Sequence, residues 1–333
     1  MAETKDFGDG VGWIRGQMLG KGSFGCVFMA TPRNPCSFPP PEMAVKSAPV
    51  QFSDTLRSER EIMSDLKGCP NLIQCLGQET TVGNDALFYN LMLEFAAGGT
   101  LSDRIQSSGG GLPEPEVRAH TRSILMGLDH IHSHGYVHCD LKPDNILLVP
   151  DGQNGFTAKI SDFGLAKREP KRAGRKRAAA GPGKWQGTPM YLPPEAVTEG
   201  LQEAAGDVWA VGCVVVEMLT GRPLWEPGSK EEILRSIGED WEYLRIPEWI
   251  SDEAADFLMC CLEKEPSGRV RTDLLLYHPF VEGSFETGDC GSGVGGFSED
   301  YYSSCARLGV VEGCVGPGNE DVGRGPPGFA VAV

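Results

Sequence analysis

The feature that most constrains how this chain can fold is a pair of polar motifs, His138–Asn145 and Asp162–Gly164. Each lies beside a short apolar run that predicts a strand, at residues 146–149 and 157–160. Side chains at strand ends, and in the loops beside them, commonly face one cleft where catalytic groups gather. The spacing therefore predicts that one candidate base, Asp140, lies in the same cleft as the Asn145 amide and the Asp162 carboxylate, whose oxygens suit a metal ion.

These motifs, His-Cys-Asp-Leu-Lys-Pro-Asp-Asn and Asp-Phe-Gly, resemble those of the eukaryotic protein kinases. The resemblance implies phosphoryl transfer from ATP, in which the protein mainly positions the reactants and neutralises charge with Mg²⁺ and cations. Asp140 would orient the substrate hydroxyl and accept its proton, and Lys142 would lie against the transferred phosphate. Asn145 and Asp162 would hold Mg²⁺, which prefers oxygen ligands. His138 is expected to be a packing and backbone-support residue rather than a base.

A glycine-rich run, Leu-Gly-Lys-Gly-Ser-Phe-Gly-Cys-Val at residues 19–27, predicts a tight turn between two strands. Without a Cβ atom, glycine lets backbone N–H groups approach a phosphate closely. The same spacing could open a dinucleotide-binding unit or be a plain turn. Here strand-like residues, Cys26–Ala30, follow the glycines where a dinucleotide fingerprint would run into a helix. The order therefore favours a kinase phosphate loop.

Met43–Lys46 resembles the third-strand kinase motif, whose lysine contacts the α- and β-phosphates. That lysine needs an acidic partner on the next helix. Four residues share one stripe at helical spacing: Glu59, Ile62, Met63 and Leu66. We therefore assign Glu59 as the partner of Lys46, with Glu61 as the less favoured alternative.

Residues 91–99 resemble the kinase hinge, where backbone groups of Glu94 and Ala96 pair with adenine and Leu93 is the gatekeeper. The ATP contacts that the resemblance implies are Leu19, Gly20, Lys21, Gly22, Ser23, Phe24, Gly25, Val27, Ala44, Lys46, Glu94, Ala96 and Asp103. The catalytic set that it implies is Asp140, Lys142, Lys46, Glu59 and Thr188.

Gly-Thr-Pro-Met-Tyr-Leu-Pro-Pro-Glu, at residues 187–195, resembles the peptide-docking loop of serine/threonine kinases, with Pro-Pro-Glu where Ala-Pro-Glu is usual. The Leu-Lys-Pro-Asp-Asn run also resembles that class rather than the tyrosine kinases. Glu195 and Arg269 are expected to form a buried, structural ion pair.

The resemblance covers residues 13–280 and implies an α+β, bilobal protein kinase fold. A small, mainly β lobe with one key helix would span 13–93, and a large, mainly α lobe 94–280. Residues 1–12 would be an N-terminal extension. Residues 281–333 are rich in Gly, Ser and acids and are interpreted as a disordered tail of unknown role.

Apolar periodicity predicts an amphipathic helix over residues 116–132 that supports the catalytic loop. His130 and His134 are spaced as zinc ligands could be. No Glu lies between them and no third ligand is nearby, so surface or packing histidines are preferred.

Composition excludes several classes. The chain has 333 residues, is 40% hydrophobic and 23% charged, and has the make-up of a soluble globular protein. No secretory signal is evident, and the longest apolar run, Val208–Val216, predicts a buried helix rather than the roughly 20-residue span that a bilayer needs. Eleven scattered cysteines indicate reduced thiols. A net charge of −16 argues against nucleic-acid binding and for a monomer. We expect a cytoplasmic location, with a nuclear one also open.

Two departures from the kinase pattern coincide. Cys139 stands where an arginine usually pairs with a phosphate on the activation segment, and a thiol cannot replace it. Residues 165–186 contain no Ser, Thr or Tyr to accept that phosphate. We hypothesise that activity does not require phosphorylation of this segment, and that expression, a partner or the tail controls it.

The same segment carries a basic run: Lys167, Arg168, Lys171, Arg172, Arg175, Lys176 and Arg177. A solvated, mobile loop is the simplest interpretation. Docking of an acidic substrate and nuclear import are the alternatives.

The catalytic motif extended to Ile-Leu-Leu, together with residues 91–101 and 187–191, is similar to the short, single-domain MAP kinase kinase kinases of plants. That resemblance implies that MAP kinase kinases are the protein substrates. Another cytosolic serine/threonine kinase is the alternative. A pseudokinase scaffold would have lost Lys46, Asp140, Asn145 or Asp162, and none of them is lost.

Overall fold

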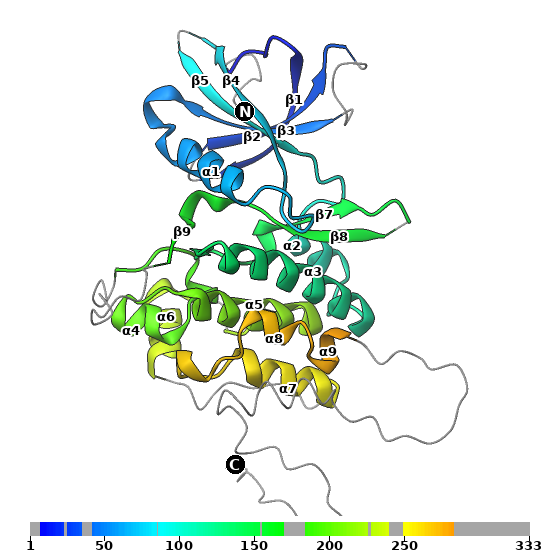
Figure 1. Cartoon of the computed structure of the whole chain (residues 1–333), viewed down its shortest axis with the longest axis vertical. Coiled ribbons are helices and arrows are strands. Elements are labelled where there is room, and N and C mark those ends of the chain that lie inside the picture. The colour runs from blue at the N-terminus through cyan, green and yellow to red at the C-terminus, as the bar shows by residue number, and fades with distance from the viewer. Residues whose placement is uncertain are drawn as a thin grey trace, which may run out of the picture. The chain divides into compact units, whose positions relative to one another are not determined.

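The structure is a computed structural model that describes residues 7–22, 25–34, 42–84, 86–153, 155–169, 184–225, 228–239 and 249–282. Within these ranges a small, mainly β lobe lies against a large helical lobe, which confirms the predicted bilobal α+β fold (Figure 1). Ser23 and Phe24 of the glycine-rich loop, most of the basic run and residues 283–333 of the predicted tail lie outside the described residues. The predicted domain boundaries stay predictions.

The small lobe is one antiparallel sheet with strand order β1-β2-β3-β5-β4. Its strands are β1 (Trp13–Gly22), β2 (Gly25–Pro32), β3 (Met43–Pro49), β4 (Cys75–Val82) and β5 (Leu87–Glu94). In β2 the alternate residues Cys26, Phe28 and Ala30 are buried, as expected of a strand with one face on a core. Val27, between them, is half-buried and lies on the opposite face of the sheet.

Helix α1 (Asp54–Asp65) packs beside the sheet (Figure 1). Its buried residues are Leu56, Glu59, Ile62 and Met63. Ile62 and Met63 belong to the predicted stripe, and Leu56 lies on the same face one turn earlier, so burial of this face holds the helix in place. Glu59 is carried inward on the same face, whereas Glu61 is exposed.

The large lobe contains eight helices and four short strands among the described residues. They are α2 (Leu101–Ser107), α3 (Glu114–Ser133), β6 (Tyr136–Val137), β7 (Ile146–Pro150), β8 (Phe156–Ile160), β9 (Lys167–Arg168), α4 (Pro194–Glu199), α5 (Ala204–Thr220), α6 (Lys230–Glu239), α7 (Asp252–Cys261), α8 (Thr272–Leu275) and α9 (Pro279–Glu282). Short 3₁₀ turns lie at Val50–Phe52, Pro143–Asn145, Phe163–Leu165, Pro189–Tyr191 and Pro266–Gly268. β7 pairs with β8, and β6 with β9.

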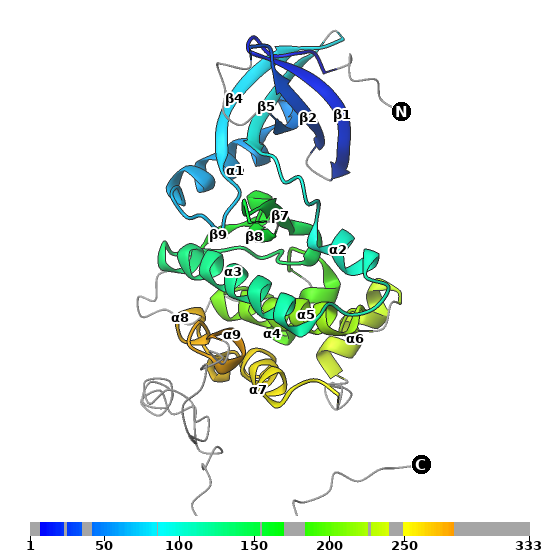
Figure 2. The same cartoon turned by 90° about the vertical axis from the view of Figure 1, so that its right-hand side faces the viewer.

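Helix α5 forms the centre of the large lobe, with α3 and α7 packed against it. Twelve of its 17 residues are buried, which is typical of a helix surrounded by protein. The predicted buried helix at Val208–Val216 is the middle of α5. The predicted helix over 116–132 is α3, which extends two residues further at its start and one at its end. Figure 2 shows these helices stacked below β7 and β8.

The segment between α1 and β4 is bonded to the large lobe. Ile73 N–H donates to the Ile160 carbonyl at 3.0 Å, and Ile160 N–H donates to the Asn71 carbonyl at 2.9 Å. On α3, Gly127 permits this approach, because a Cβ there would lie 2.9 Å from the Asn71 oxygen. The His130 ring Nε2 also contacts the Leu66 carbonyl at 3.2 Å. The C-terminal end of α1 is therefore fastened to the helices below it.

No helix in the described ranges is both long enough and apolar enough to cross a membrane.

Candidate active site

Lys46 of β3 is the centre of the upper half of the site. Its buried ammonium contacts Glu59 Oε2 at 2.7 Å and Asp162 Oδ1 at 2.9 Å. Burial disfavours the charged form, but the two carboxylates outweigh it and raise the pKa of Lys46 above its usual value. The structure thus pairs Lys46 with Glu59, the assigned acid, and not with the exposed Glu61.

Asp162 joins this pair from the loop after β8. Its backbone is left-handed, with φ 58°, and its carboxylate accepts the Gly164 N–H at 3.2 Å. Burial alone would raise the pKa of Asp162, and the ammonium of Lys46 more than offsets it, so the pKa is lowered. The side chain remains 36% exposed, which leaves carboxylate surface open to a cation from the cleft.

Four predicted residues form a closed network in the lower half of the site. Asp140 Oδ1 accepts from the Thr188 hydroxyl at 2.7 Å, and Asp140 Oδ2 contacts Lys142 Nζ at 3.0 Å. Lys142 Nζ also donates to Thr188 Oγ1 at 2.7 Å. Asn145 Nδ2 donates to the Asp140 carboxylate and carbonyl at 3.1 and 2.8 Å. Asp140 is therefore held in one orientation from three sides.

Asp207 of α5 is a supporting residue whose role sequence reasoning missed. Its buried carboxylate accepts the backbone N–H groups of His138 and Cys139 at 2.8 and 2.9 Å and contacts the His132 ring at 3.0 Å. Burial would raise its pKa, but the hydrogen bond and charge of His132 hold the pKa below its usual value. The Asp207-Val208-Trp209 triplet was the sequence signal available for it.

The catalytic loop needs this support because its backbone is strained. Cys139 has φ 67°, a left-handed conformation that is costly for a non-glycine residue. Burial raises the pKa of its thiol to about 12, so it stays a neutral thiol at physiological pH. His138 is fully buried, its Nε2 lies 3.0 Å from the Ser161 carbonyl and its Nδ1 accepts the Asp140 N–H. Its contacts match the support role expected for it.

The predicted ATP contacts from Leu19 to Lys46 that the structure describes lie along β1, β2 and β3. In β1, Leu19, Gly20, Lys21 and Gly22 are exposed. Val27 pairs with Lys46, and Ala44 pairs with Leu93, so both half-buried side chains lie next to the site. Gly25 has φ 142° and approaches the Ser47 carbonyl so closely that a Cβ would lie 2.3 Å from it. Only glycine fits at that turn.

At the hinge, the Glu94 side chain is bound to Lys159 at 2.7 Å and its N–H donates to the Gln74 carbonyl. These contacts leave the backbone carbonyl of Glu94 as the group for the adenine contact expected there, and that contact stays a prediction. Asp103 accepts from the N–H and hydroxyl of Thr100 at 3.0 and 2.7 Å, which caps α2. A contact of Asp103 with the nucleotide would share that carboxylate with the cap.

The loop that ends the activation segment is anchored on both sides. Arg269 forms the expected buried pair with Glu195, through two parallel bonds of 2.7 and 2.8 Å. Gly187, with φ 111°, brings the loop onto the catalytic loop, because a Cβ there would lie 2.5 Å from the Cys139 carbonyl. This contact sets Thr188 against Asp140.

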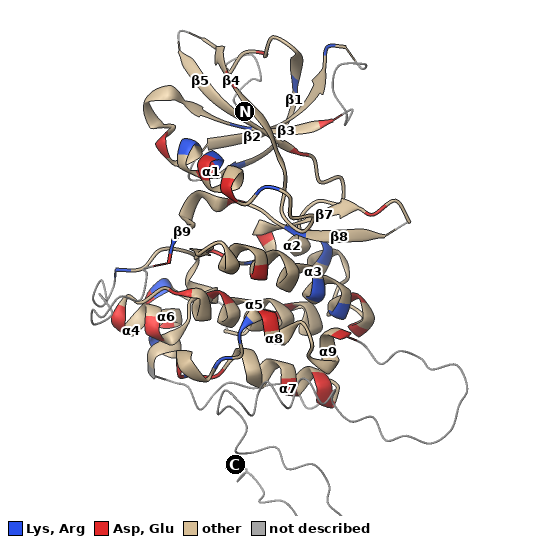
Figure 3. Cartoon of the chain, in the orientation of Figure 1, with Lys and Arg blue, Asp and Glu red and all other residues tan. Residues whose placement is uncertain are grey.

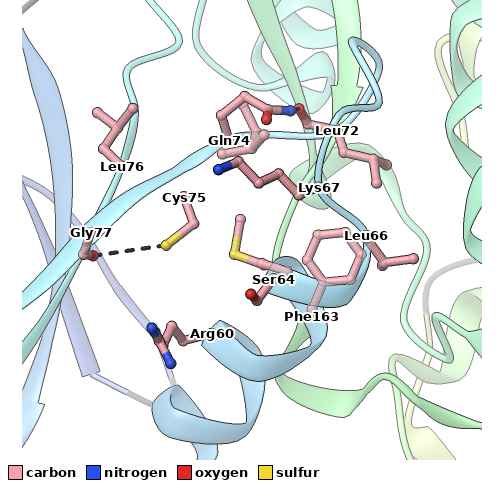
Figure 4. Close-up of a pocket in the computed structure, with 12 residues that line it drawn as sticks. Arg60, Ser64, Leu66, Lys67, Leu72, Gln74, Cys75, Leu76, Gly77 and Phe163 are labelled. Carbon is pink, nitrogen blue, oxygen red and sulfur yellow. Dashed lines mark hydrogen bonds between the residues drawn. The ribbon is translucent and has the colours of Figure 1, made fainter.

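A separate cavity of about 180 Å³ lies between α1 and β4 (Figure 4). Its walls include Arg60, Lys67, Cys75 and Phe163, and burial raises the pKa of the Cys75 thiol. None of the predicted ATP or metal residues lines it. The cavity is therefore not the nucleotide site.

The zinc alternative for His130 and His134 has no support. The ring centres of His130 and His134 lie 4.2 Å apart. The His130 ring contacts the Leu66 carbonyl, and the His134 ring contacts the His130 carbonyl and the Ser133 hydroxyl. Within the described ranges, the one trio spaced for a metal is Asp256, Cys260 and His278.

A comparison with protein families matches residues 13–281 to the protein kinase domain. The chain belongs to the protein kinase family, and it is a serine/threonine protein kinase that uses ATP.

Among curated proteins it is similar to mitogen-activated protein kinase kinase kinase 20 of Arabidopsis thaliana, with 42% identity over 81% of this chain and 78% of the relative. Kinase kinase kinases 17 and 18 of the same plant are 38% and 39% identical, again over 81% of this chain, and 69% and 77% of their own lengths are covered. The resemblance to plant MAP kinase kinase kinases is confirmed.

Proposed function

We propose that this kinase is a MAP kinase kinase kinase that phosphorylates MAP kinase kinases on serine or threonine. The observation that carries the proposal is the similarity over most of the chain to three plant relatives with that name. The network around Asp140 supports transfer to a hydroxyl, because it leaves a fixed carboxylate beside the docking loop.

In this proposal Asp140 receives the proton of the substrate hydroxyl. Lys142, 3.0 Å from that carboxylate, faces the charge that develops on the transferred phosphate. Lys46 holds the α- and β-phosphates, and Glu59 keeps its ammonium in position. Thr188 positions both Asp140 and Lys142 through its hydroxyl.

The donor set of the cleft fits Mg²⁺. Asn145 commits its amide nitrogen to Asp140, so its amide oxygen is the atom left for a cation. Asp162 supplies an ionised carboxylate. Oxygen donors are those that Mg²⁺ takes, and a bound Mg²⁺ would neutralise charge on the phosphates of ATP.

The test is transfer of labelled phosphate from ATP to a panel of purified MAP kinase kinases made inactive beforehand. We expect at least one to be labelled on serine or threonine, and labelling to be lost with Asp140→Asn and with Lys46→Met. Labelling of a generic basic protein but of no MAP kinase kinase would leave a serine/threonine kinase with another substrate. Equal labelling by the parent kinase, Asp140→Asn and Lys46→Met would contradict the assigned site.

Three further parts of the proposal concern the whole protein. We propose a monomer in the cytoplasm, with entry into the nucleus open to test by imaging a tagged full-length chain. Phosphorylation of residues 165–186 is not required for activity, since they contain no hydroxyl side chain. Size measurement in solution at several protein concentrations tests the monomer.

A further inference from the structure

Three side chains from three elements meet at the C-terminal end of α1. Asp65, the last residue of α1, accepts on its Oδ2 atom from the Tyr136 hydroxyl at 2.6 Å and from Arg168 Nη2 at 2.8 Å. Arg168 also lies over the Tyr136 ring, with its guanidinium carbon 4.5 Å from the ring centre. These three residues are called the α1 clasp below.

The α1 clasp joins α1, the helix that carries Glu59, to β6 and β9, the two short strands next to the catalytic residues. Tyr136 is in β6, which leads into the catalytic loop, and Arg168 is in β9, which follows the Asp-Phe-Gly loop. The two residues face each other across the β6–β9 pair. Figures 1 and 2 both show β9 below α1. One carboxylate therefore ties α1, the catalytic loop and the start of the activation segment together.

Kinases with an arginine before the catalytic aspartate can link that loop to the activation segment through a phosphate. This chain has Cys139 at that position and no hydroxyl between residues 165 and 186. We propose that the α1 clasp supplies this link without phosphate, and that Asp65, Tyr136 and Arg168 are positioning residues for phosphoryl transfer. The proposal rests on the kinase activity proposed above, and it identifies what keeps α1 in place when no phosphate can do so.

The placement of Asp65 supports a specific role. An acidic side chain at a helix C-terminus faces the negative end of the helix dipole, so it is unfavourable there unless a cation compensates. Arg168 provides that cation, and burial together with Asp65 raises the pKa of Tyr136, which keeps its hydroxyl a donor. Figure 3 shows residues of both signs along α1.

Exposure limits what the α1 clasp can do. The Asp65 side chain is 49% and that of Arg168 67% exposed, so the pair contributes little to the stability of the whole fold. A weak contact can still change the relative populations of two positions of a helix when their free energies are similar. The α1 clasp should therefore affect catalysis more than unfolding.

The central experiment compares the full-length chain with its Asp65→Ala variant. We expect the variant to lose about 3- to 10-fold in kcat, the effect of one hydrogen bond and one exposed ion pair. Its unfolding midpoint should change little, because the higher helix propensity of alanine offsets the loss of an exposed ion pair. Asp65→Asn can still accept from Tyr136, so it should retain more activity than Asp65→Ala.

A matched control is available in the large lobe. Asp273→Ala breaks the Arg271–Asp273 pair, which has the same 2.8 Å contact and exposures of 72% and 45%. It should leave kcat unchanged. The exchanged pair Asp65→Arg with Arg168→Asp should recover part of the rate that either single change removes, because the ion pair forms again in reverse.

Amide hydrogen exchange of α1 tests the proposed role of the α1 clasp independently of the proposed kinase activity. Exchange at residues 56–66 should be faster in Asp65→Ala than in the parent chain, whatever protein substrate is used. Unchanged exchange and unchanged kcat would overturn the proposal, as would a kcat loss that follows a lowered midpoint with unaltered exchange. Faster exchange in a chain that labels no protein would uphold the α1 clasp and reject the proposed function.

Discussion

At the scale of single residues, the hydroxyl of Thr188 is placed to control the base. It donates to Asp140 and accepts from Lys142, each at 2.7 Å. Thr188→Val keeps the shape and removes both bonds, so we expect kcat to fall about 10- to 100-fold, the effect of a charge-assisted hydrogen bond worth about 1.5 to 3 kcal/mol. Steady-state rates at saturating ATP measure it. Thr188→Ser is the control and should keep most of the rate; equal rates for Val and the parent chain would contradict the role.

The carboxylate of Asp207 makes the stability of the protein depend on acid pH. Its pKa is lowered in the folded state, so it contributes stability above its unfolded pKa of about 4 that is lost as pH falls through the folded value. Asp207→Asn removes the buried charge from His132 and should cost about 3 kcal/mol at pH 7.

Denaturant unfolding of both proteins between pH 3 and pH 7 measures this. The difference in unfolding free energy should be largest at neutral pH and shrink toward the acid end. A difference that stays constant with pH would show that the Asp207 charge does not matter.

At the scale of elements, the turn at Gly187 brings two loops into contact. With φ 111° and the Cys139 carbonyl 2.5 Å from an added Cβ, Gly187→Ala must push the docking loop away from the catalytic loop. We expect kcat to fall at least about 10-fold, because small displacements of positioned groups are costly in catalysis. Gly238→Ala in α6 is the control, since its Cβ would meet nothing nearer than 3.8 Å. A normal rate in Gly187→Ala would contradict this account of the turn.

Local pattern predicted much of this arrangement. The stripe on residues 59–66 was enough to choose Glu59 over Glu61, because helical spacing decides which side chains turn inward. The strands beside the two motifs were found from short apolar runs. What local pattern could not supply were bonds between distant parts of the chain, such as Asp207 with Cys139 and Asp65 with Arg168, which are 68 and 103 residues apart. No periodicity reports on such contacts.

At the scale of the whole molecule, activity should be insensitive to phosphatase. The described contacts around Asp140 and Lys46 form without any phosphate, and residues 165–186 cannot accept one on a hydroxyl. We therefore expect protein freed of phosphate to label substrate at the same rate as untreated protein. Mass spectrometry must show that phosphate has been removed, and loss of activity at that point would contradict the expectation.

The bonds from Asn71 and Ile73 to Ile160 have a mechanical consequence. They hold the segment that follows α1 against the end of β8 in the large lobe. When the two lobes move apart, the sheet should rotate about this attachment while the C-terminal end of α1 stays close to the large lobe. The distance between Lys46 in the sheet and Glu59 in α1 would then increase first. The separation of the two lobes and the position of the Lys46 ammonium would therefore depend on the same hydrogen bonds.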